Sequence, residues 1–115
     1  MDEPSDTELQ LRYNPRLRAE QAELRAASGD TTANRKPVEL DQQSVGRLSR
    51  MDAMQQQAMA AAQETRRRAR LTAIEAALRR LDEGEFGWCA DCGAFVGTRR
   101  LDLDPTLMRC VDCAR

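Results

Sequence analysis

The cysteines of this sequence are its clearest chemical signal. There are four of them, in two pairs with two residues between the members of each pair: Cys89, Cys92, Cys110 and Cys113. The chain contains no histidine. Two cysteines at this spacing let one tight turn aim both thiolates at a common point, and two such pairs can complete a tetrahedron. The pattern therefore indicates a metal site with four thiolate ligands.

Zinc is the metal that this ligand set fits best, at about 2.3 Å from each sulfur. Gly93 directly follows the second cysteine, where the turn calls for a positive φ. Because four cysteines leave no open coordination position, we expect one structural zinc ion and no catalytic metal. Its binding would supply on the order of 10 kcal/mol of folding free energy to a terminal segment too short to fold alone.

Other chemistry for the four thiols depends on the compartment. Iron–sulfur ligation stays open on spacing alone, since four thiolates suit both a zinc ion and an iron–sulfur cluster. Two disulfides would need an oxidising compartment. The stretch MDEPSDTELQLRYNP is acidic and lacks an apolar run, and no stretch approaches the ~20 apolar residues that cross a bilayer. We therefore expect a cytoplasmic protein with reduced cysteines and no membrane association.

The rest of the chain has the composition of long helices. Only 3% of the 115 residues are aromatic and 32% are charged, so a thick core is not expected. The formal net charge of -1 gives no overall signal for nucleic-acid binding. These totals predict a mostly α protein.

A first helix is expected from residue 15. Asn14 followed by Pro15 is typical of a helix start, with asparagine as the cap and proline in the first turn. Gly29 and Asp30 are typical of a helix end. The segment after them is rich in turn-forming residues and contains Pro37, which predicts a loop near residues 29–41.

A second, longer helix is expected over residues 41–82, capped by Asp41 or Ser44. No proline interrupts this stretch. Its second half repeats apolar residues at spacings of 3, 4 and 3, the rhythm of a coiled-coil seam: Leu71, Ile74, Leu78 and Leu81.

Together these segments predict an antiparallel helical hairpin, or coiled coil, followed by a small C4 zinc finger. Residues 1–14 form a polar N-terminal extension, residues 15–83 the hairpin and residues 84–115 the finger. The short first helix covers only part of the long one. Either residues 5–13 or a second copy of the chain must cover the remainder.

The terminal segment GEFGWCADCGAFVGTRRLDLDPTLMRCVDC resembles the DksA/TraR family of C4-type zinc-finger transcription factors. The likeness goes beyond cysteine spacing, since glycines, aromatic residues, an arginine–leucine pair and a proline stand at the family's positions. These residues are Phe86, Gly87, Trp88, Gly93, Val96, Arg100, Leu101 and Pro105.

The resemblance implies a bacterial transcription regulator that binds RNA polymerase directly and not promoter DNA. Such a protein inserts its coiled-coil tip through the secondary channel toward the active site, often together with the alarmone ppGpp, while the zinc finger forms the base. We expect a monomer with no sequence-specific DNA binding, for which ppGpp is at most an indirect partner.

The tip differs from the family pattern D-x-x-D-x-A. If Asp41 holds the first acidic position, Ser44 replaces the second and Gly46 replaces the alanine. An ungapped count back from the first cysteine places Gly46, Ser49 and Met51 there instead. Our candidate polymerase-contacting residues are Asp41, Gln42, Ser44 and Arg47.

Two other functions compete with this hypothesis. A zinc-ribbon adaptor would use its coiled coil to dimerise or to bind another protein. A DNA-binding protein would use the arginine run Arg66, Arg67, Arg68 and Arg70. We favour a solvated helix face or a protein contact for that run, because Glu64 can pair with Arg68 and no interleaved aromatic residue offers base stacking.

Enzymatic activity is not expected. The sequence offers no histidine, no buried acid pair and no glycine loop of the kind that cradles phosphate. Asp41 and Asp52 are better explained as helix-start residues than as a catalytic pair. Met51, Met54 and Met59 suit a helix seam as well as they suit a pliable binding groove.

Overall fold

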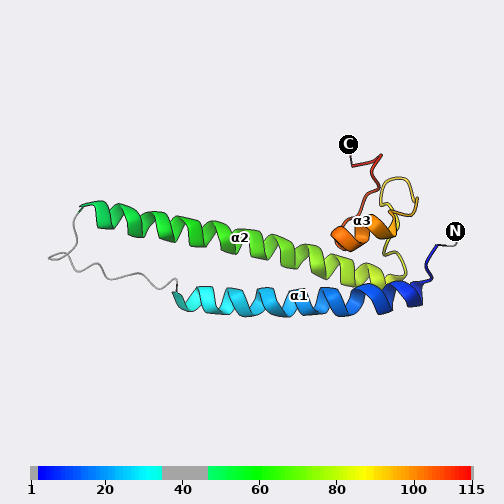
Figure 1. Cartoon of the computed structure of the whole chain (residues 1–115), viewed down its shortest axis with the longest axis horizontal. Helices are drawn as coiled ribbons and strands as arrows, with labels where there is room; N and C mark the ends of the chain where they lie inside the picture. The colour runs from blue at the N-terminus through cyan, green and yellow to red at the C-terminus, as the bar shows by residue number, and fades with distance from the viewer. Residues whose placement is uncertain (1–2, 35–46, 115) are drawn as a thin grey trace. The chain divides into compact units, whose positions relative to one another are not determined.

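A computed structural model of the chain describes residues 3–34 and 47–114. It contains three helices, α1 (Asp6–Asn34), α2 (Arg47–Glu83) and α3 (Thr98–Leu103), shown in Figure 1. The described residues form no named strand. The expected fold class is confirmed: the protein is mostly helical, with a long helical hairpin followed by a zinc-finger region.

The chain divides into two compact units. The first contains residues 1–21 and 71–115, and the second contains residues 22–70. In the first unit, the start of α1 lies beside the end of α2 with opposite chain direction, next to the finger (Figure 1). The described residues of the second unit are the remaining parts of the same two helices. The division into three segments expected from the sequence stays a prediction.

The first helix begins at Asp6, so the expected start at Pro15 is wrong. Ser5 caps the helix, because its hydroxyl oxygen accepts a hydrogen bond from the backbone N–H of Glu8 at 3.2 Å. Serine followed three residues later by glutamate is the sequence pattern of a capping box. This pattern marks the true helix start.

Burial explains why the helix continues through Pro15. Proline inside a helix costs about 3 kcal/mol, and its ring here is exposed. Leu9, Tyr13 and Leu17 are spaced four residues apart and are only 2%, 1% and 0% exposed. Each such burial contributes roughly 1.5–3 kcal/mol, so together they outweigh the proline.

The expected helix end at Gly29 is also wrong, since α1 continues to Asn34. A glycine inside a helix costs only about 1 kcal/mol relative to alanine. Of the loop expected near residues 29–41, residues 35–41 lie outside the described residues. For the second helix, Asp41 and Ser44 also lie outside them, and α2 is described from Arg47 to Glu83.

The core of the first unit joins α1 to the second half of α2. Leu9, Tyr13 and Leu17 supply one side of it. The other side comes from α2, where Ile74, Leu78 and Leu81 of the predicted seam are buried together with Ala77. Leu71, the first residue of that seam, is half-buried. Gln10 adds a polar contact, donating through its Nε2 atom to the carbonyl of Leu81 at 2.9 Å. In this unit the start of α1 therefore covers α2, the first of the two possibilities raised by the sequence.

The end of α2 is fixed by Gly84, which has a φ of 74°. The N–H of Glu85 donates to the carbonyl of Arg80 at 2.8 Å, and the N–H of Gly84 donates to that of Leu81 at 3.3 Å. This pair of bonds is the Schellman motif, in which the left-handed position favours glycine. It ends the helix sharply and turns the chain into the finger.

In the second unit, a shallow groove of about 290 Å³ lies between Leu24 of α1 and the arginine run of α2. Met51, Met54 and Met59 are more than half exposed on α2. Among the described residues, no helix combines the length and apolar character needed to span a membrane.

Candidate metal centre

The first cysteine pair lies on a tight turn. The N–H of Cys89 donates to the carbonyl of Ala94 at 2.7 Å, and the N–H of Gly93 donates back to the carbonyl of Cys89 at 2.9 Å. Gly93 has a φ of 78°, which confirms the expectation for this position. Next to the turn, Trp88 and Phe95 form an isolated antiparallel bridge, and their rings meet edge to face at 5.5 Å.

The second cysteine pair is tied to the first through the backbone. The N–H of Ala90 donates to the carbonyl of Met108 at 2.8 Å, which brings the two cysteine turns together. Within the second turn, the N–H of Ala114 donates to the carbonyl of Cys110 at 3.0 Å. These bonds set the positions of both cysteine pairs.

The four sulfur atoms of Cys89, Cys92, Cys110 and Cys113 lie within 4.8 Å of one another. The Sγ atoms of Cys92 and Cys110 are 3.6 Å apart. A tetrahedron with zinc–sulfur bonds of about 2.3 Å places its sulfurs about 3.8 Å apart. All four thiols are free of disulfides. The cluster thus fits a single zinc ion, in agreement with the sequence prediction.

The electrostatics of the cluster favour a bound cation. Backbone N–H groups of Cys110 and Cys92 hydrogen-bond the Cys89 sulfur and lower its pKa to about 6. Hydrogen bonds with the neighbouring thiols of Cys110 and Cys92 raise the pKa of Cys113 above its usual range. Closely packed thiols cannot all ionise by themselves, because each negative charge opposes the next. A divalent cation removes this conflict.

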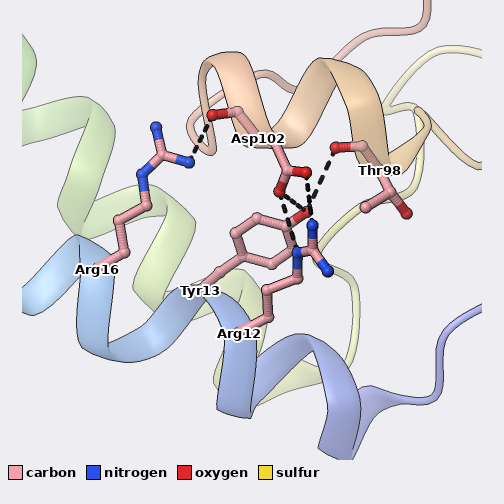
Figure 2. A network of polar contacts seen from close by, with 5 residues as sticks. All are labelled: Arg12, Tyr13, Arg16, Thr98 and Asp102. Atoms are coloured by element: carbon pink, nitrogen blue, oxygen red, sulfur yellow. Dashed lines mark hydrogen bonds and ion pairs between the residues drawn. The ribbon is translucent and has the colours of Figure 1, made fainter.

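The finger is joined to α1 by polar contacts around Asp102 of α3, which Figure 2 shows. The Asp102 carboxylate accepts hydrogen bonds from Nε of Arg12 at 3.0 Å and from the hydroxyl of Tyr13 at 2.9 Å. Nη1 of Arg16 donates to the Asp102 backbone carbonyl at 2.6 Å. The hydroxyl of Tyr13 also lies 3.5 Å from the carbonyl oxygen of Thr98.

Sequence reasoning missed this network. Arg12 and Tyr13 lie in the segment for which the sequence predicts a polar extension, and Asp102 has no local pattern that ties it to them. The capping box at Ser5 could have placed Tyr13 on a helix. Nothing in the sequence marked Asp102 as its partner.

Asp41, Gln42 and Ser44 lie outside the described residues. Arg47 is the first residue of α2.

The arginine run is partly neutralised within α2. Glu64, only 4% exposed, accepts from Arg67 at 3.0 Å and from Arg68 at 3.2 Å. These ion pairs support the interpretation of Arg67 and Arg68 as part of a helix surface and not as a DNA-binding site.

A helical hairpin followed by a four-thiol cluster defines a small zinc-finger protein of helical fold. Residues 84–115 match the prokaryotic dksA/traR C4-type zinc finger family model. The chain is also similar to the RNA polymerase-binding transcription factor DksA of Haemophilus influenzae, with 46% identity over 48 residues, which cover 42% of this chain and 33% of that protein. The Escherichia coli K12 protein of the same name is 40% identical over 48 residues, which cover 42% and 32% of the two chains.

A solved structure shares this fold over most of the chain. Transcription factor DksA2 from Pseudomonas aeruginosa superimposes with a TM-score of 0.78 at 25% identity, covering 92% of this chain and 80% of that one. These likenesses show that residues 84–115 form a finger of the dksA/traR type and that the chain shares the fold of DksA2. The aligned sequence spans about a third of the curated relatives' length.

Proposed function

We propose that this protein is a transcription regulator that binds RNA polymerase, with one structural zinc ion held by Cys89, Cys92, Cys110 and Cys113. The observation that carries the proposal is the match of residues 84–115 to the dksA/traR finger, joined to a fold that follows DksA2 over 92% of the chain. The relatives named for polymerase binding support the choice of partner.

In this proposal the hairpin enters the secondary channel of the polymerase and its loop end approaches the active site. Asp41, Gln42, Ser44 and Arg47 are the proposed contacts. The test is a photo-crosslinking amino acid placed at position 41 or 44 of the full-length protein. Crosslinks to the polymerase subunits that surround the secondary channel are expected, whereas crosslinks confined to the outer surface would contradict insertion.

The arginine groove of the second unit is a further proposed polymerase contact. Arg66, Arg67 and Arg70 line it together with Leu24 and Gln63. A native-gel titration with polymerase would compare Arg66→Ala with Arg79→Ala, which removes an exposed arginine elsewhere on α2. Weaker binding of only the first variant is expected. Equal affinities would remove the groove from the interface.

Regulation in this proposal acts through the polymerase. The chain binds neither a promoter sequence nor ppGpp by itself, so ppGpp changes its effect only when polymerase is present. Transcription from a ribosomal promoter, measured with and without ppGpp, tests whether regulation acts through the polymerase. A salt-dependent gel shift with duplex DNA alone would contradict the expected lack of DNA binding.

A second candidate function rests on the exposed methionines of α2. Met51, Met54 and Met59 are 53%, 67% and 63% exposed, so part of this helix has uncovered apolar surface. An adaptor that dimerises through its coiled coil would bury them. Sedimentation distinguishes the two proposals, because a monomer that binds polymerase supports the regulator and a tight dimer that ignores polymerase supports the adaptor.

A further inference from the structure

The first unit contains two pairs of consecutive arginines whose side chains share an unusual arrangement. In the pair Arg79–Arg80 and in the pair Arg99–Arg100, the first side chain is exposed and the second is partly buried. Nη1 and Nη2 of Arg80 and Nε of Arg100 are buried without an acceptor. In the described part of the chain, these are the buried side-chain nitrogens that lack a partner. Such groups are rare because their desolvation is uncompensated.

Arg80 lies beside the first cysteine turn. It lines the same cleft as Cys89, Trp88 and Ala90, with a volume of about 380 Å³. Its guanidinium carbon is 6.0 Å from the centroid of the Phe86 ring. Burial lowers the pKa of Arg80, and the nearby charge of Glu85 only partly opposes this shift. The guanidinium is thus a partly desolvated cation next to a metal-ligand turn.

Arg100 lies beside the second cysteine turn. Its Nη2 donates to the backbone carbonyl of Arg109 at 3.2 Å, and Arg109 directly precedes Cys110. The Arg109 side chain is paired with Asp91 at 3.0 Å. Arg100 is therefore held against the backbone of the second turn without a carboxylate partner among the described residues.

We propose that Arg80 and Arg100 are positioning residues that offset the negative charge of the zinc–thiolate centre. One divalent zinc with four thiolates carries a net charge of about -2. The two partly buried guanidinium groups, one beside each cysteine turn, supply two positive charges, and no carboxylate among the described residues is hydrogen-bonded to either of them. The bound centre is the missing counter-charge that makes their burial favourable, and they in turn raise the affinity of the site for zinc.

Zinc transfer from the loaded, full-length protein to a chromophoric chelator tests this role. Arg80→Met and Arg100→Met keep most of the side-chain volume and remove the charge. We expect them to lose zinc at least about tenfold faster, within the range known for residues that support metal ligands. Arg79→Met and Arg99→Met are the matched controls and should release zinc at the wild-type rate. Arg80→Lys should retain most of the effect of arginine.

A second measurement separates charge compensation from packing at Arg80. In the chelator-treated protein the cation has no counter-charge, so Arg80→Met should melt at or above the wild-type temperature. In the zinc-loaded protein the same variant should melt lower. An equal loss with and without zinc, or release rates matching those of the controls, would overturn the inference. A wild-type protein that binds no zinc would instead refute the metal assignment on which it rests.

Discussion

The hydroxyl of Tyr13 donates a hydrogen bond to the carboxylate of Asp102 across 2.9 Å, joining two helices whose contacting residues are 89 positions apart. The Tyr13 ring packs at 5.2 Å from that of Phe86, which lies just before the first cysteine turn. The start of α1 is therefore part of the structure that holds the finger. A change at this contact should alter the stability of the finger and of the helix pair together.

Replacing Asp102 with alanine tests that connection. The loss leaves the part-buried Tyr13 hydroxyl without its carboxylate acceptor, which should lower the free energy of unfolding. The ion pair with Arg12 adds little, because the two side chains are 55% and 41% exposed. Urea unfolding of the zinc-loaded protein measures the change. Asp82→Ala removes an exposed carboxylate from α2 and should have little effect. Equal results for the two variants would count against the connection.

The pKa of Tyr13 predicts a pH dependence in the alkaline range. Burial, followed by the hydrogen bond to Asp102, raises this pKa to about 12. Below about pH 10 the tyrosine is protonated in both the folded and the unfolded chain. Above that pH the unfolded chain releases the proton first, so the stabilising contribution of Tyr13 is lost as the pH rises from about 10 through 12.

The measurement is the difference in unfolding free energy between the wild-type protein and Tyr13→Phe. It should be constant from about pH 7 to 9 and should shrink above about pH 10, since phenylalanine does not titrate. Other groups titrate in both proteins and cancel in the difference. A flat difference across the whole range would mean that the hydroxyl does not stabilise the fold.

The sequence predicted the parts of the protein whose signals are local. The two cysteine pairs predicted the thiol cluster, and the spacing of Ile74, Leu78 and Leu81 predicted the buried face of α2. The predicted start of α1 at Pro15 is wrong because the burial of Leu9 and Tyr13 outweighs the cost of a proline inside the helix. The Asp102 contacts depend on residues far apart in the chain, so no periodicity could reveal them.

The core between α1 and α2 predicts a large effect at Leu17. This side chain is fully buried, and Leu17→Ala should lower the free energy of unfolding by roughly 2–5 kcal/mol through lost burial and the cavity left behind. Leu11→Ala is the matched control, because that leucine lies on the same helix and is 75% exposed. Its loss should change stability by less than about 0.5 kcal/mol. Similar losses at both positions would contradict the packing described for α1.

Removing the metal should affect the two units differently. Trp88 is the only tryptophan and precedes Cys89 directly, so its fluorescence and near-ultraviolet circular dichroism report on the first cysteine turn. A strong chelator should change both signals, because metal-binding free energy supports the fold of the finger. Residues 22–70 contain no cysteine, so the helical far-ultraviolet signal should largely persist.

Added zinc should restore the tryptophan signals of the wild-type protein. Cys92→Ser, which removes an exposed thiol of the cluster, should show the altered signals without chelator and should not recover with zinc. Because Cys92 contributes little to the buried core, such a failure would reflect the lost ligand and not a packing defect. Full recovery of Cys92→Ser at stoichiometric zinc would show that three thiols suffice and would argue against a closed four-cysteine site.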